Sequence, residues 1–202
     1  ETDMPSATPR AITRDDLIDM EEYGRTRKDR RGALVARKKN RRVGLGPYAT
    51  VYFECYATMW HQIHEMLFIE RGGEAQIDDE LSAYNPLIPN GHELVATVMF
   101  EIDDEVRRKM VLSKLGGVEE TAFLNFAGET IAGVPEADVD RTNADGKASS
   151  VQFIHFPFSD AQVAAFRTSG GDVTLGFTHP DYAHMTILTE DVHAELSGDF
   201  RA

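Results

Sequence analysis

Ten of the chain's 21 Lys and Arg residues fall between Arg25 and Arg42, where only Asp29 opposes them. Helix formers predominate from Arg25 to Lys39 and apolar residues are few, which predicts a helix with a mostly solvated or partner-facing surface. The whole chain carries a formal net charge of −13, and most of its acidic residues lie after residue 50. A cationic segment on an anionic body therefore needs a partner, either within the fold or outside it.

Composition limits the class of protein. With 202 residues, of which 42% are hydrophobic, the chain can bury a core as one domain. The negative net charge disfavours binding of nucleic acid or of an anionic membrane by the surface as a whole. Nucleic acid is therefore not expected as a partner, and a homo-oligomer stays open.

Cys55 is the single cysteine, so a disulfide within the chain and a site with four cysteine ligands are excluded. No apolar run reaches the roughly 18–20 residues of a membrane span, and the first residues lack a signal-peptide pattern. We expect a cytoplasmic protein without membrane contact.

The order of strand and helix patterns predicts an α+β fold, with a mixed, mostly antiparallel sheet, packed helices and a helical N-terminal region. Residues 1–11 are expected to be a flexible tail, and residues 12–202 a single globular domain with a polar loop at 135–149. A capping box at Thr13 and Asp16 predicts a short helix through about Tyr23. The segment from Thr178 to His184 is expected to be a loop.

The clearest predicted helix covers Tyr56 to Glu70. Its wheel places His61, His64 and Glu65 on one side, away from the apolar stripe. Two imidazoles and a carboxylate at this spacing predict a site for a divalent metal, zinc or iron. The spacing matches no established metalloenzyme motif, so a solvated helix face that happens to carry two histidines is the competing interpretation.

The same wheel places Glu70 in the middle of the apolar face. A carboxylate there is costly unless it is paired. The end of the basic segment supplies candidate partners, so we expect an internal ion pair between Glu70 and one of Lys38, Lys39, Arg41 or Arg42. A ligand-binding or catalytic role of Glu70 is the alternative.

A third, weaker hypothesis is an anion site over Lys38–Pro47.

The chain resembles a bacterial family, domain-of-unknown-function family 3501, over nearly its full length. The likeness rests on sequence motifs throughout the chain: Ile12–Leu17, Lys38–Val43 with Leu45–Pro47, Gln62–Leu67 with Glu70, Asp79–Leu81, Tyr84–Pro89, Ser150–Phe156 and His179-Pro180. The resemblance implies no assigned activity. It does imply a genomic setting near rubrerythrin and an iron–sulfur oxidoreductase, and it favours Glu65, Glu70 and the run Lys38-Lys39-Asn40-Arg41-Arg42 over the two histidines.

Two functions follow as hypotheses. The first is a non-catalytic accessory protein of a redox or peroxide-stress system, with rubrerythrin or the oxidoreductase as protein partner and Arg25–Arg42 as the contact surface. The second is a metal-dependent enzyme or metal-binding protein that uses His61, His64 and Glu65.

Overall fold

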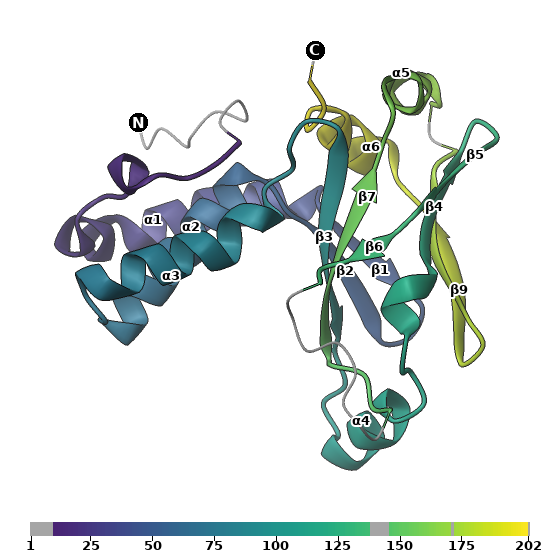
Figure 1. The fold of residues 1–202 in the computed structure, drawn as a ribbon, viewed down its shortest axis with the longest axis horizontal. Coiled ribbons are helices and arrows are strands. Elements are labelled where there is room, and N and C mark those ends of the chain that lie inside the picture. Colours follow the sequence, from purple (N-terminus) through teal and green to yellow (C-terminus); the bar gives the residue numbers. More distant parts are fainter. Residues whose placement is uncertain (1–9, 138–145, 171, 202) are drawn as a thin grey trace.

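The computed structural model describes residues 10–137, 146–170 and 172–201, which form a helical arm beside a β-sandwich (Figure 1). The elements of the arm are η1 (Arg14–Asp16), α1 (Met20–Lys39), α2 (Tyr56–Glu70), α3 (Glu74–Tyr84) and η2 (Asn85–Leu87). Asp19 caps α1 by accepting hydrogen bonds from the backbone N–H groups of Glu21 and Glu22. The arm has its own apolar core, in which Tyr23, Trp60 and Ile63 are buried.

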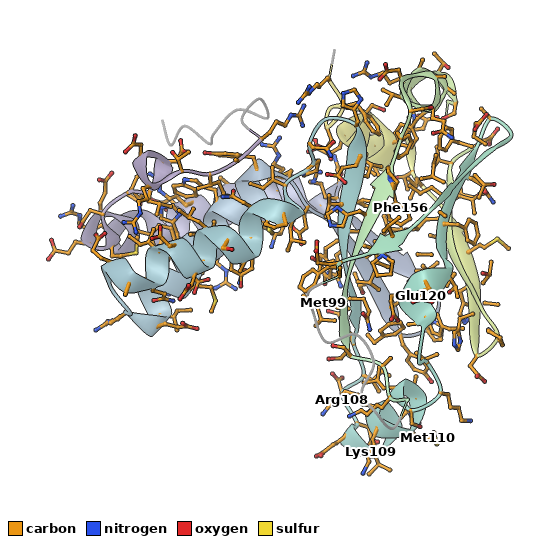
Figure 2. The ribbon with its side chains drawn as sticks, viewed as in Figure 1. Met99, Arg108, Lys109, Met110, Glu120 and Phe156 are labelled. Atoms are coloured by element: carbon orange, nitrogen blue, oxygen red, sulfur yellow. The ribbon has the colours of Figure 1, made fainter. Side chains whose placement is uncertain are left out.

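The strands form two antiparallel sheets. One sheet has the order β1-β2-β3-β7-β6 and the other β5-β4-β8-β9. Their bounds in chain order are β1 (Arg42–Leu45), β2 (Ala49–Phe53), β3 (Glu93–Phe100), β4 (Ala122–Phe126), β5 (Glu129–Ala132), β6 (Val134–Pro135), β7 (Val151–Pro157), β8 (Thr174–His179) and β9 (Tyr182–Ile187). Alternate residues of β7 face the core, so Ile154 and Phe156 are fully buried. Figure 2 shows Phe156 on this strand.

Short helices lie at the two ends of the sandwich (Figure 1). One end carries α5 (Asp160–Thr168) and α6 (Glu190–Ser197), and the other carries α4 (Glu105–Leu112), with η3 (Val118–Thr121) following it in the chain. Ser159 caps α5 by accepting a hydrogen bond from the N–H of Gln162, as its position before the helix predicts. The position of α6 matters for the site, because it lies close to the junction of arm and sandwich.

The α+β class and the helical N-terminal region are confirmed, with the strands divided between two sheets. Two local predictions are wrong. The chain after Thr13 makes only a 3-10 turn before α1 begins at Met20, although Asp16 does accept hydrogen bonds from Thr13. The expected loop at 178–184 is the β8–β9 hairpin.

Tyr182 explains why β9 forms. Its buried hydroxyl donates to the carbonyl oxygen of Leu45 at 2.8 Å and accepts from the N–H groups of Tyr48 and Ala49. Gly46, between β1 and β2, has a φ of +68°, and a Cβ there would come within 2.7 Å of the His184 ring. A glycine is therefore needed for β9 to pack on the β1–β2 turn.

Residues 1–9 of the predicted tail, and 138–145 of the predicted polar loop, lie outside the described residues. Arg10, within the predicted tail, donates hydrogen bonds to the carbonyl oxygens of Pro89 and Asp199. Among the described residues, no helix has both the length and the apolar composition that crossing a bilayer requires.

Candidate functional site

The basic segment divides into an inner and an outer set of side chains. At 100° per residue, the positions of Arg27, Arg30 and Arg37 fall on the same side of α1 as its buried residues, Tyr23 and Leu34. Arg27 binds Glu65, Arg30 lies 5.2 Å from the Trp60 ring centroid, and Arg37 lies 3.4 Å from a carboxylate oxygen of Glu195. Arg27 and Arg30 hold the arm together, whereas Arg37 links α1 to α6.

Arg41 is the buried end of the inner set, with 1% of its surface exposed. Its guanidinium pairs with the carboxylate of Asp199 and, at 3.0 Å, with that of Glu195, both at the C-terminal end of the described chain. It also donates to the carbonyl oxygens of Phe53 and Glu54, each at 2.9 Å. Arg41 thus joins the end of α1, the end of β2 and α6.

The prediction that Glu70 pairs with the basic segment is wrong. Glu70 is exposed, and its carboxylate accepts a hydrogen bond from the side chain of Gln76 at 2.8 Å. Glu70 is the last residue of α2, where the helix has passed the edge of the arm core. The wheel gives the direction of a residue around the helix, but it does not give its depth along the axis.

Glu65 lies in a hydrogen-bonded network between α1 and α2. Arg27 donates two hydrogen bonds to its carboxylate, at 2.8 and 2.7 Å, and the Tyr23 hydroxyl donates a third at 2.6 Å. The hydrogen bonds from Arg27 lower the pKa of Glu65 to about 2, whereas burial raises the pKa of Tyr23. Glu65 is therefore held ionised, and Tyr23 stays a hydrogen-bond donor.

His61 contacts the same network. Its Nδ1 lies 3.1 Å from the Tyr23 oxygen. Because the single hydroxyl hydrogen of Tyr23 points to Glu65, the hydrogen of this second bond comes from His61. Burial lowers the pKa of His61, which favours the neutral ring. No sequence pattern indicated Tyr23 as the centre of the network, because its partners are 38 and 42 residues away.

His64 is buried and both of its ring nitrogens are in use. Nδ1 lies 2.7 Å from the carbonyl oxygen of Trp60, which can only accept, so Nδ1 carries the hydrogen. Nε2 then accepts the N–H of Ile18 at 3.2 Å. Burial lowers the pKa of His64 to about 4. The ring keeps no lone pair for a metal in this arrangement.

The predicted metal site gains no support from this geometry. Within the described ranges, no three or more His, Cys, Asp or Glu side chains are grouped so that they could hold a metal ion. Glu65 and His61 do share a network, but Tyr23 and Arg27 occupy it. The structure thus brings together two of the three predicted residues, Glu65 and His61, and uses them to dock α1 on α2.

The outer set consists of five exposed cations on α1: Arg25, Lys28, Arg31, Lys38 and Lys39, which we call the basic face. None of them forms a hydrogen bond or ion pair with another described side chain. Helical spacing places them within an arc of about 140° that points away from Tyr23 and Leu34. Val35 lies within this arc and is 62% exposed.

The last predicted residues at this end have structural roles. Asn40 is the C-cap of α1, where its N–H binds the carbonyl oxygens of Arg37 and Lys38. Arg42 is exposed, lies 3.9 Å from a carboxylate oxygen of Glu101 and stacks over the Tyr52 ring. The anion site expected over Lys38–Pro47 stays a prediction.

A second group of cations lies on α4, at the opposite end of the sandwich from α5 and α6 (Figure 2). Arg107 and Lys109 are exposed there, together with Val106 and Met110. Arg108 donates to the carbonyl oxygen of Ile102 at 2.9 Å. In the sequence this group is hidden by the excess of acidic residues after residue 50.

Comparison with known proteins places the chain in a family. The family model described as a protein of unknown function (DUF3501) matches residues 11–200. The chain belongs to the DUF3501 family. Its fold is similar to the crystal structure of a protein of unknown function from Burkholderia pseudomallei, with a TM-score of 0.87 and 35% identity over 95% of this chain and 100% of that one. No curated protein matches the chain.

Membership of the DUF3501 family confirms the resemblance derived from the sequence motifs. The matched range includes both the arm and the sandwich, so the two parts together make up the unit that defines the family. Both the family and the Burkholderia protein are described as being of unknown function, so neither assigns an activity.

Proposed function

We propose that this DUF3501 protein is an interaction component that binds an acidic protein partner through the basic face of α1. The observation that carries the proposal is the contrast between the two sides of one helix. The inner cations are used within the fold, whereas the five outer cations have no acidic partner in the described chain although its net charge is −13.

The basic face costs stability in the free protein. Like charges three or four residues apart on a helix repel each other by about 0.2–0.5 kcal/mol per pair, and Arg25, Lys28 and Arg31 form such a series. An acidic surface that docks here removes this repulsion. Charge complementarity of this kind speeds association and selects partners more than it adds affinity.

The basic face also has an apolar contact point. The side chain of Val35 is 62% exposed and is surrounded by Lys and Arg on the same arc. An apolar residue within a polar rim is the usual composition of a protein interface. A protein partner that combines acidic and apolar residues suits this face better than a nucleic acid, because no aromatic side chain lies in the arc for a base to stack on.

The partner that we propose is a component of a redox or peroxide-stress system, rubrerythrin or an iron–sulfur oxidoreductase. The family resemblance supports this choice. The positive charge of the basic face supports an acidic partner.

Binding of purified protein to each of these two candidates, measured by biolayer interferometry, tests the proposal. We expect the double variant Lys28→Glu/Arg31→Glu to abolish binding, and added salt between about 0.05 and 0.5 M to weaken wild-type binding at least tenfold. The matched control is Arg107→Glu/Lys109→Glu on α4, which makes the same charge change elsewhere. Absent binding, insensitivity to salt, or an equal loss in the control would refute the proposal.

A further inference from the structure

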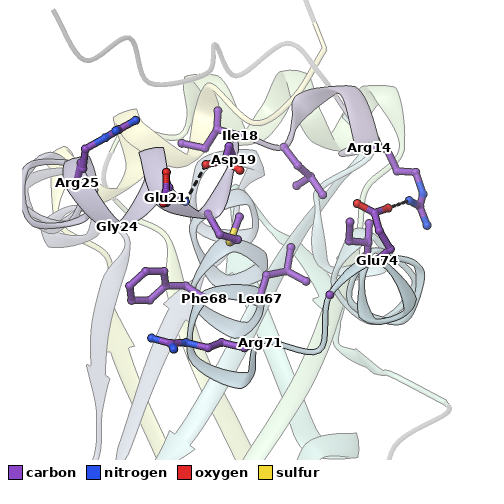
Figure 3. A pocket seen from close by; sticks show the side chains of 14 residues that line it. Arg14, Ile18, Asp19, Glu21, Gly24, Arg25, Leu67, Phe68, Arg71 and Glu74 are labelled. Carbon is purple, nitrogen blue, oxygen red and sulfur yellow. Dashed lines mark hydrogen bonds and ion pairs between the residues drawn. The ribbon is translucent and has the colours of Figure 1, made fainter.

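A cavity of about 960 Å³ opens in the helical arm, far from the sandwich core (Figure 3). It lies between the segment from η1 to the start of α1, the end of α2 and the start of α3. Its walls are mostly apolar: Leu17, Ile18, Met20, Leu67, Phe68 and Ile77. Sites for small molecules usually have about 300–1,000 Å³ and the same composition, apolar walls with a few polar groups.

Phe68 forms one wall of the cavity, and α1 passes close to its ring. A Cβ at Gly24 would come within 2.8 Å of a Phe68 ring carbon, so a glycine is required for this approach. The centroid of the ring lies 5.1 Å from the guanidinium carbon of Arg27, also on α1, which is fixed by Glu65. The wall is therefore held in place before any ligand binds.

Some of the charged side chains on the rim of the cavity are bonded within the fold, and others are not. Arg14 pairs with Glu74 and Asp78, and Asp19 caps α1. Arg25 and Arg71 form no hydrogen bond or ion pair with other described side chains, and both line the cavity. Arg25 and Arg71 are therefore the lining cations without a salt bridge to a described side chain, beside the exposed carboxylates of Asp19 and Glu21.

The backbone of Arg71 is the most unusual feature of the rim. Arg71 ends α2 in the left-handed conformation, with φ 56° and ψ 35°, and its N–H binds the carbonyl oxygen of Leu67. Glycine is the preferred residue at a helix end of this conformation, and any other residue lowers the stability of the fold by roughly 1 kcal/mol relative to glycine. Backbone strain of this kind is often found at ligand-binding sites, where the side chain has a functional role. Figure 3 shows the Arg71 side chain running beside Phe68 along the edge of the cavity.

We propose that the cavity binds a small amphipathic monoanion, a carboxylic acid with an apolar chain. The chain would lie against Leu67, Phe68 and Ile77, and the carboxylate would pair with Arg71, with Arg25 as a second cation. The planar fork of an arginine matches a carboxylate in two parallel hydrogen bonds. The three arginines of the lining are matched by the three carboxylates of Asp19, Glu21 and Glu74, and a rim that is neutral overall suits a monoanion better than a phosphate with two charges.

Calorimetric titration of the full chain with dodecanoate, and with dodecan-1-ol as its uncharged match, tests this assignment. We expect dodecanoate to bind at least about tenfold more tightly than the alcohol, since a hydrogen bond to a charged group changes affinity by that order. Equal affinities, or no dodecanoate binding in the millimolar range, would overturn it.

Arg71→Gly separates ligand binding from folding. Glycine relaxes the strained end of α2, so this variant should keep or raise the midpoint of thermal unfolding while it weakens dodecanoate binding roughly tenfold. Arg107→Gln on α4 removes a charge elsewhere and should bind like the wild type. Ile77→Glu places a carboxylate in the cavity and should abolish binding. Unchanged dodecanoate binding in Arg71→Gly or in Ile77→Glu would show that the ligand lies elsewhere.

These experiments are independent of the proposed partner. Arg71 and Ile77 lie outside the basic face, so either proposal can fail while the other stands.

Discussion

Replacing Arg41 by alanine removes the cation that joins the arm to α6. The carboxylate of Asp199, whose side chain is only 6% exposed, would stay buried without its partner, and the carbonyl oxygens of Phe53 and Glu54 would lose a donor. Removing one member of a buried ion pair costs about 3–5 kcal/mol. In a chain of this length each kcal/mol lowers the unfolding midpoint by about 2–4 °C, so we expect a fall of about 10 °C.

Equilibrium unfolding in urea, followed by circular dichroism, measures this loss directly. A double-mutant cycle with Arg41→Met and Asp199→Leu isolates the pair, and we expect the double variant to be more stable than the sum of the single losses predicts. Glu70→Gln is the matched control, because Glu70 is exposed and bonded only to Gln76 among the described side chains, and it should change stability by less than about 0.5 kcal/mol.

Two outcomes would contradict the role given to Arg41. One is a loss below about 1 kcal/mol in Arg41→Ala. The other is a loss in Glu70→Gln as large as that in Arg41→Ala, which would restore the ion pair first predicted from the helix wheel.

Three further predictions concern other described contacts. Glu65→Gln should destabilise the protein by about 1–2 kcal/mol at neutral pH. The folded pKa of Glu65 is lowered to about 2, so this loss of stability should shrink as pH falls from about 4.5 towards 2, which urea unfolding measures. The His155 ring donates hydrogen bonds to the carboxylates of Glu93 and Glu136, and these bonds raise the pKa of His155. The stabilisation lost in His155→Gln should therefore be full below pH 6.5 and vanish as pH rises through the folded pKa, which NMR titration of the ring locates. Gly46→Ala should cost about 1–3 kcal/mol because of its positive φ and the His184 ring, whereas the control Gly44→Ala, with open space at its Cβ, should be nearly neutral in thermal unfolding.

The sequence predicted the helices and strands well where apolar residues repeat throughout the element at the spacing of a helix or a strand. The bounds of α2 agree with the prediction, because Tyr56, Ile63 and Leu67 repeat at the helical spacing and all three are buried in the arm core. β9 was missed because its outward residues Met185 and Ile187 are apolar and exposed, which obscures the alternation that identifies a strand.

The partners of the charged residues could not be predicted in the same way. Arg41 meets Asp199 across 158 positions of the chain, and no periodic pattern connects residues so far apart. His64 could be placed on a helix side, but its hydrogen bonds to Trp60 and Ile18 depend on how the segment before α1 folds back. The sequence shows which residues need partners, and only the tertiary structure shows which partner each one has.

The link between Arg41 and α6 has a consequence for the order of folding. Arg41 is synthesised more than 150 residues before the two carboxylates that neutralise it, so for most of translation the start of the sandwich carries a guanidinium that cannot be buried. The buried residues of the arm core all lie within residues 12–95, so this core can form early. Docking of the arm on the sandwich must wait for α6, which makes the closing of this junction a late, long-range step in the assembly of the molecule.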